Sequence, residues 1–372
     1  MDRHRSPPAF RLPALAFALA SLAAPRAAAA QQPAQRGGAG VVRGVVQAGP
    51  DEPVPYAVVA LQPRFAQRFT DAAGSFAFTH VPAGTYHLIA RQVGFKPLDT
   101  TVVLAADHAL DLTVTLERIT VELEAITVVA SRGCTQPGPP DAGSPELVSL
   151  FAELRQNAQQ FKLLATTYQF RYWMARTFTD LDEVGNVASR ITDTVEYVSS
   201  AQVHYRPGDV LGVTTLPDGS TTPAFVLPTL TDLADSGFQA NHCFSFRGRV
   251  EQDKAEVLRF HFRPPESLTA PDLEGDVDLD PRTYHIVRAS VTLTHSETAR
   301  EGVRAAGATI TFSELLPNVV VQQRVTGYQD LAAPVLQLSG ARHISRYLED
   351  QRLVATRFLH PLPGGPPPQP SP

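Results

Sequence analysis

The side chains best suited to chemistry lie in two neighbouring segments of the second half of the chain. HCFSFRGRV (242–250) and EVLRFHFRP (256–264) alternate aromatic with basic residues, as a strand with one buried face does. Their exposed face would carry several cationic side chains: Arg247, Arg249, Arg259, His261 and Arg263. The pattern permits an anion-binding patch that includes Arg247, Arg259 and Arg263.

In the next segment, LEGDVDLD (273–280), acidic residues alternate with mainly apolar ones. Leu273, Val277 and Leu279 share one parity and are expected in the core. The other parity carries four carboxylates, which predicts an exposed acidic face: Glu274, Asp276, Asp278 and Asp280. A calcium site is one interpretation, although the twelfth position counted from Asp272 is Thr283, where an EF-hand loop requires Glu. We favour a simpler one, in which the acidic strand neutralises the basic hairpin.

Aromatic residues cluster at a third place. Tyr168, Phe170 and Tyr172 alternate with Gln169, Arg171 and Trp173, which predicts a strand with bulky groups on both faces. Core packing is the simpler use of these rings. The alternative is a groove lined by Tyr168, Phe170, Tyr172 and Trp173 that receives an acyl chain, or a sugar ring stacked on Trp173.

Motifs for catalysis are missing from the sequence. No His has the H-x-x-E or H-E-x-x-H context of a zinc hydrolase, and His108 with Asp111 is the nearest spacing. There is no G-x-S-x-G, S-x-x-K or P-loop motif. We therefore expect no enzymatic activity, no metal and no cofactor. A hydrolase with a dispersed Ser/His/Asp triad stays open as an alternative, because triad members need not be adjacent in sequence.

The chain has only two cysteines, Cys134 and Cys243. We predict that they form a disulfide if the protein is exported. Two free thiols are the alternative.

The N-terminus predicts that export. Arg3, Arg5 and Arg11 precede a 13-residue apolar run, and Ala28–Ala30 supplies small residues for cleavage. We expect a signal peptide over residues 1–30 and a flexible leader over 31–40. No Cys stands at the cleavage site to take a lipid, so the mature protein is expected in the periplasm or secreted, without a transmembrane segment.

Length and composition limit the class of protein and the number of domains. The 372 residues are 43% hydrophobic and 19% charged, with a net charge of -5, which excludes a disordered chain and a basic nucleic-acid binder. A chain of this length suggests about two domains.

Short apolar alternations broken by Gly, Pro and Asp predict about seven strands in residues 41–131, the last being LEAITVVAS (123–131). Asp71 and Gly74 predict a turn, after which Phe76 and Phe78 face the core. The string TDAAGSFAFTHVPAGTYHL (70–88), followed by Gly94-Phe95, resembles the carboxypeptidase regulatory-like domain. This resemblance implies a transthyretin-like, carbohydrate-binding-like β-sandwich, common in secreted and envelope proteins, that serves as an accessory module without catalytic residues.

A Pro/Gly-rich linker (132–144) leads to a second predicted domain (145–360), and a Pro-rich tail (361–372) ends the chain. Ser144 and Pro145 predict the start of one amphipathic helix of about 18 residues, and the long alternating segments after it predict an antiparallel meander in an α+β domain. Residues 242–284 resemble uncharacterised bacterial proteins that carry the same N-terminal domain. The succession of long strands also resembles the open half-barrel of periplasmic lipoprotein carriers.

Together these features predict a mainly β, exported, non-catalytic envelope protein that acts as an interaction or binding module. Its partner would be an envelope protein, a lipid or a glycan, and not nucleic acid. A periplasmic carrier of lipid or carbohydrate is the alternative, and an apolar cavity in the second domain would favour it.

Overall fold

The computed structural model describes residues 39–119, 133–139, 145–202, 205–215, 219, 221–233, 235–299, 302–337 and 342–365. The predicted signal peptide, the predicted strand at 123–131 and the last seven residues lie outside this part of the chain. Residues 37–372 form one compact unit. Among the described residues, no helix combines the length and apolar character needed to cross a membrane. The protein is mainly β, as predicted, while the predicted domain boundaries stay predictions.

The N-terminal part is a sandwich of two four-stranded sheets. In the first, β2 (Glu52–Pro53), β1 (Ala39–Gly49) and β5 (Ser75–Pro82) are neighbours, and β8 (Ala109–Thr115) pairs with β1 in parallel. The second has the order β4 (Phe65–Phe69), β3 (Val58–Gln62), β6 (Gly84–Arg91), β7 (Leu98–Leu104).

The predicted turn and core face of the sandwich are confirmed. The Asp71 carboxylate accepts hydrogen bonds from the Ala73 and Ser75 N–H groups, and Gly74 has a φ of 74°. Phe76 and Phe78, on β5, are buried. The strand β4 was not predicted, because the polar Gln67 stands between Phe65 and Phe69 on the face that the two rings share.

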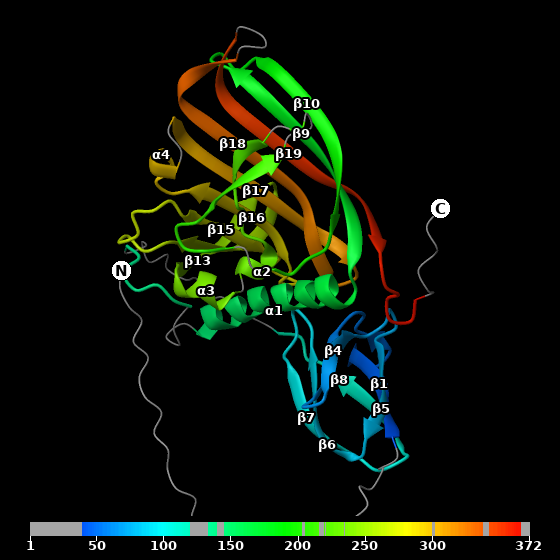
Figure 1. Ribbon diagram of the computed structural model, residues 1–372. Coiled ribbons are helices and arrows are strands. Elements are labelled where there is room, and N and C mark those ends of the chain that lie inside the picture. The colour runs from blue at the N-terminus through cyan, green and yellow to red at the C-terminus, as the bar shows by residue number, and fades with distance from the viewer. Residues whose placement is uncertain are drawn as a thin grey trace, which may run out of the picture. The chain divides into compact units, whose positions relative to one another are not determined.

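The second part is built on one nine-stranded antiparallel sheet (Figure 1). Its order is β10-β9-β19-β18-β17-β16-β15-β14-β13, so it is open, with β10 and β13 at its edges. The strands are β9 (Phe170–Asp182), β10 (Val187–Val198), β13 (Cys243–Gln252), β14 (Ala255–Arg263), β15 (Leu273–Leu279), β16 (Ile286–Leu293), β17 (Val303–Leu316), β18 (Val319–Gln337) and β19 (Arg342–Phe358). The predicted meander holds for β13 to β19. It is wrong for β9 and β10, whose hairpin attaches to β19, the last strand.

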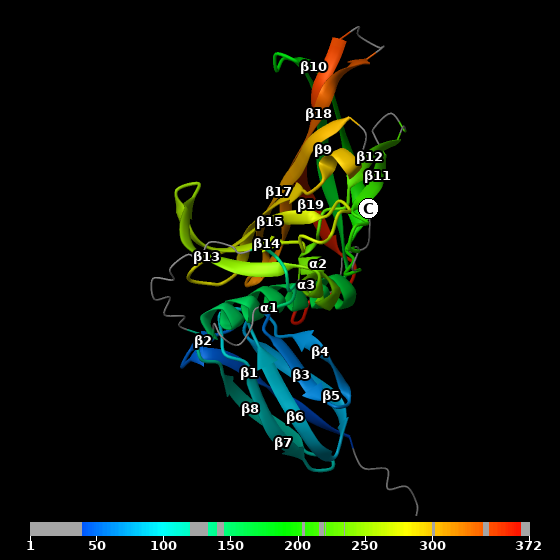
Figure 2. The same ribbon diagram turned by 90° about the vertical axis from the view of Figure 1, so that its left-hand side faces the viewer.

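Shorter elements lie between β10 and β13. A two-stranded hairpin, β11 (Leu211–Thr215) and β12 (Thr221–Phe225), is followed by the short helices α2 (Leu230–Leu233) and α3 (Ser236–Ala240). Figure 2 shows α2 and α3 next to α1 (Pro145–Thr167) on one side of the large sheet. A further short helix, α4 (Ser296–Ala299), precedes β17.

Helix α1 has 23 residues, more than the predicted 18, and is buried on two sides. Leu150, Phe151 and Leu154 join the core that covers the large sheet. Its last turns belong to a different cluster, in which Leu164 packs with Phe69 of the sandwich. The helix is longer than predicted because this second contact extends its buried surface.

Polar side chains of α1 are buried at the same junction. Gly94 N–H, from the sandwich, donates to Glu153 Oε2 at 2.7 Å, and Gln160 donates to Gln92 at 2.7 Å. Asn157 donates to the Tyr284 carbonyl and accepts from the Ile286 N–H, at 3.0 and 3.1 Å. The bonds to Gly94, Tyr284 and Ile286 pair backbone groups that burial would otherwise leave unsatisfied, and the bond to Gln92 pairs two buried side chains.

Glu153 is expected to make stability depend on pH. Burial raises its pKa from 4.5 to about 7, and the Gly94 N–H opposes this only in part. The stability that the protonated Glu153 side chain contributes is complete below pH 4.5 and is lost as pH rises through 7. This loss lowers the free energy of unfolding by about 3 kcal/mol. We expect Glu153→Gln to gain stability over the wild type between pH 5 and 8, measured by urea unfolding. Glu251→Gln, at an exposed site, is the control, and parallel profiles for wild type and Glu153→Gln would contradict the assignment.

Candidate functional site

An apolar cavity of about 160 Å³ lies between the helices and the large sheet. Its wall combines side chains from α1, α2 and four strands: Phe161, Phe170, Tyr172, Met174, Leu230, Phe312, Val321 and Leu353. It is smaller than a cavity that would enclose a whole lipid, but its lining is mainly hydrophobic, as in ligand pockets.

Strand alternation builds this wall. Phe170, Tyr172 and Met174 have the same parity on β9, so they point to one face. Register places Met174 opposite Leu353 of β19, and Tyr172 opposite Tyr197 of β10, whose ring stacks on it at 5.4 Å. Burial raises the pKa of Tyr172, so this ring stays an uncharged part of the wall.

The hydroxyl groups at the cavity already have partners in the protein. Ser199 accepts from the Phe170 N–H and donates to the Ala165 carbonyl, and Thr229 donates to Asp232 Oδ2 at 2.6 Å. Ser200 accepts from the Gln202 N–H. With these three hydroxyls engaged, Tyr172 and Gln322 supply the other polar groups of a lining that is otherwise apolar.

The four aromatic residues singled out in the sequence do not all lie here. Phe170 and Tyr172 line the cavity. Tyr168 precedes β9 and stacks on Phe69 of the sandwich at 5.4 Å. Trp173 has the opposite parity on β9, because strand residues alternate between faces, and it lies across from Glu196 and Ala355.

A polar cluster continues the inward row of β9 beyond Met174. Arg176, 6% exposed, donates to both carboxylate oxygens of Asp193, at 2.8 and 2.5 Å, and to the Thr215 carbonyl of the β11–β12 hairpin at 3.2 Å. Glu349 lies nearby and accepts from Gln351 at 2.7 Å, while burial raises its pKa. Sequence reasoning missed this cluster, although the shared parity of Met174 and Arg176 is a usable signal.

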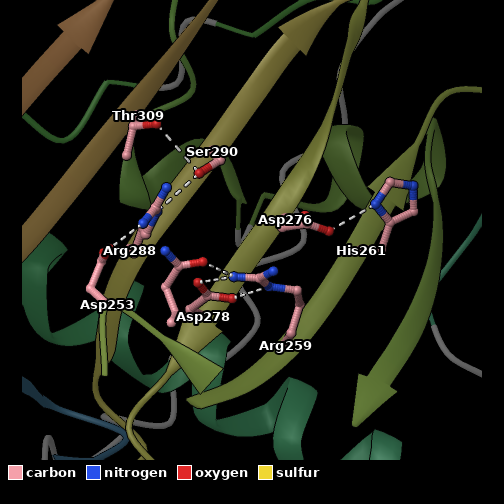
Figure 3. A network of polar contacts seen from close by, with 9 residues as sticks. Asp253, Arg259, His261, Asp276, Asp278, Arg288, Ser290 and Thr309 are labelled. Carbon is pink, nitrogen blue, oxygen red and sulfur yellow. Dashed lines mark hydrogen bonds and ion pairs between the residues drawn. The ribbon is translucent and has the colours of Figure 1, made fainter. Parts of the chain in front are cut away.

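Of the predicted anion patch, Arg259 is engaged in an ion pair, and so is the neighbouring His261 (Figure 3). Arg259 donates to both oxygens of Asp278 at 2.7 Å, and His261 lies 2.9 Å from Asp276 and 3.2 Å from Glu274. The basic hairpin and the acidic strand therefore pair with each other.

One detail of that prediction is wrong. Asp278 was expected to be exposed, but it is 1% exposed, because the Arg259 guanidinium covers it on the sheet surface. Arg247 lies at a bulge between Phe246 and Gly248. Burial opposes ionisation of Asp276, but the hydrogen bond and charge of His261, with smaller contributions from Arg259 and Arg247, lower the pKa of Asp276 overall. Arg263 lies opposite Cys243.

The predicted disulfide is confirmed: Cys134 and Cys243 are bonded, with 5.6 Å between their Cα atoms. Gly138 N–H also donates to the His242 carbonyl at 2.9 Å, so this part of the predicted linker lies along the start of β13.

A buried group of titratable side chains lies below α3. Tyr205 donates to Asp272 at 2.9 Å, and His242 Nε2 is 3.8 Å from Asp272 Oδ1, with the His and Asp side chains fully buried. Substrate in solution cannot reach them, so their role is to hold α3 against β15.

Known proteins give one family match. Residues 41–117 match the carboxypeptidase regulatory-like domain. The regulatory-like domain thus covers β1 to β8, the whole described sandwich, as its sequence motif implied. No curated protein matches the chain.

Three solved structures resemble part of the chain, each at 11% identity. They are a putative outer membrane lipoprotein-sorting protein domain from Vibrio parahaemolyticus, a DUF1329 family protein from Desulfovibrio piger and a LolA superfamily protein from Nitrosomonas europaea. They cover 56%, 57% and 56% of this chain and 93%, 92% and 95% of their own, with TM-scores of 0.32, 0.30 and 0.25. Likeness at this level carries no inference about a ligand.

Breaking the Arg259–Asp278 pair should be costly. We expect Asp278→Ala to lower the free energy of unfolding by about 2–3 kcal/mol, because it leaves a partly buried guanidinium without its carboxylate partner and with the neutral Gln252 in hydrogen-bond contact. Arg249→Met, which breaks the exposed pair with Glu256, should cost under about 1 kcal/mol. Denaturant unfolding measures both, and equal losses would contradict the role of burial.

Removing the disulfide should also destabilise the protein. The bond closes a loop over a separation of 109 residues, so the double variant Cys134→Ser/Cys243→Ser should lose about 3–5 kcal/mol. Thiol titration of the denatured, unreduced wild type should find almost no free thiol. Two free thiols per chain would refute the bond.

Proposed function

We propose that this protein is an exported, non-catalytic binder of apolar chains, such as the acyl chain of a lipid. The observation that carries this proposal is the apolar cavity between α1, α2 and the large sheet. It favours the carrier alternative over a pure interaction module, because an interaction module needs no apolar pocket between its helices and its sheet.

The size of the cavity bounds its occupant. An apolar cavity of about 150 Å³ is large enough to hold benzene, so about 160 Å³ suits a short apolar segment. A long acyl chain would require neighbouring elements to move. The short helix α2 is one such element, since its Leu230 lines the cavity.

Two features support an extracytoplasmic location. The disulfide is typical of oxidising compartments, and the first 30 residues have the pattern of a cleaved signal peptide. Absence of catalysis is part of the same proposal, and it rests on the missing motifs and on the full burial of His242 and Asp272.

Filling the cavity should abolish binding. We expect the wild type to bind a fluorescent fatty acid, and Leu353→Trp to weaken that binding at least tenfold, because the larger ring occupies the cavity. Val354→Trp is the matched control, since Val354 is the next residue and is 53% exposed. Fluorescence titration gives the affinities, and thermal unfolding checks that both variants fold. Equal affinity in the three proteins, or no binding by the wild type, would overturn the proposal.

A further inference from the structure

A groove of about 450 Å³ crosses the other face of the large sheet, over β16 to β19. Val291, Ala308 and Val325 are buried in the core on one face of these strands. Ser290, Thr309 and Thr326 have the opposite parity, so they face away from the cavity. The groove is therefore separate from the proposed apolar site.

Hydroxyl groups form a row across the groove. Register places Ser290 of β16 opposite Thr309 of β17, and Thr309 opposite Thr326 of β18. The Ser290 and Thr309 hydroxyls are 3.5 Å apart (Figure 3). Each hydroxyl can donate and accept, as can the hydroxyls of a sugar, and since Ser290 also accepts from Arg288 Nε at 3.2 Å, a sugar would share this row with the protein's own bonds.

An aromatic ring borders this row. Tyr328 lies directly opposite Gly307, and a Cβ placed at Gly307 would lie 2.9 Å from Tyr328 Cε1. The ring therefore leans across the glycine, an arrangement that covers the bare backbone. Tyr328 is half-buried, and the Arg346 guanidinium lies over its ring at 6.0 Å from the centroid, so a ligand would share the exposed part of the ring with Arg346.

The charged groups around the groove are paired within the protein. Arg346 forms a bidentate pair with Asp330, and Arg324 forms one with Asp350 at 2.7 and 2.8 Å. Arg288 pairs with Asp253 at 2.9 Å. A polyanion would have to compete with these carboxylates, whereas an uncharged polyol would not.

We propose that this groove binds an uncharged oligosaccharide. The hydroxyl row can exchange hydrogen bonds with sugar hydroxyls, and the Tyr328 ring can pack against a sugar ring. The arginines around the groove are already paired with carboxylates, so they do not call for a charged ligand. The groove is long enough for more than one ring, because its lining crosses four neighbouring strands, β16 to β19, which at the spacing of adjacent strands span about 14 Å. The proposal does not depend on the apolar cavity.

Titration calorimetry with maltohexaose, cellohexaose and chitohexaose tests this on the full mature chain. We expect at least one of them to bind, Tyr328→Ala to weaken that binding at least tenfold, and Thr326→Val to weaken it several-fold. Tyr328→Phe should keep most of the affinity. Thr113→Val, at an exposed position on β8, is the matched control, and Leu353→Trp should leave sugar binding unchanged.

Three results would overturn the proposal. The first is no heat with any of the three sugars at millimolar concentration. The second is binding that Thr326→Val and Tyr328→Ala both leave unchanged. The third is full displacement of the sugar by poly-L-glutamate, which would indicate a polyanion surface. Thr326→Val keeps the test valid even if Tyr328→Ala does not fold.

Discussion

The described structure depends on burying helix α1 on two sides at once. An amphipathic helix normally has one buried stripe, and its polar stripe faces water. In α1 the apolar stripe packs over the large sheet, while polar residues of another stripe bond to the sandwich and to the Tyr284–Ile286 backbone. The hydrogen bonds of Glu153, Asn157 and Gln160 make this second burial possible. A buried polar side chain without a hydrogen-bond partner would destabilise the fold, because it loses its bonds to water and gains none in the protein.

The cavity follows from the same arrangement. Phe161, on α1, forms part of its wall, and the inward residues of β9 and β19 form the opposite part. Since α1 is held from both sides, the helix cannot easily shift to close the space. The cavity can therefore change its volume only if other elements move. The short elements between β10 and β13, which include α2, are the ones that we expect to move.

Local patterns in the sequence predicted much of this. The alternation of Phe76 and Phe78 predicted a core face, the charges of 256–263 and 273–280 predicted their mutual pairing, and two cysteines in an exported chain predicted the disulfide. What could not be predicted depends on long-range contacts. Glu153, Asn157 and Gln160 recur at the spacing of a solvent-facing stripe, so their burial is invisible without the sandwich. The attachment of β9 to β19 and the burial of Asp278 depend likewise on which strands become neighbours.

The bond between Cys134 and Cys243 also bears on self-association. An open sheet has two edges whose unpaired backbone groups can recruit a strand from another molecule. At the β13 edge, the tethered segment occupies the first residue through the bridge from Gly138 to Cys243, so an incoming strand cannot align with the beginning of β13. At the β10 edge, the described strand partners include only β9, and Val187, Ile191 and Val198 are exposed on β10. A strand from another molecule would therefore meet an obstacle at the beginning of β13 that the described part of the chain does not place at β10.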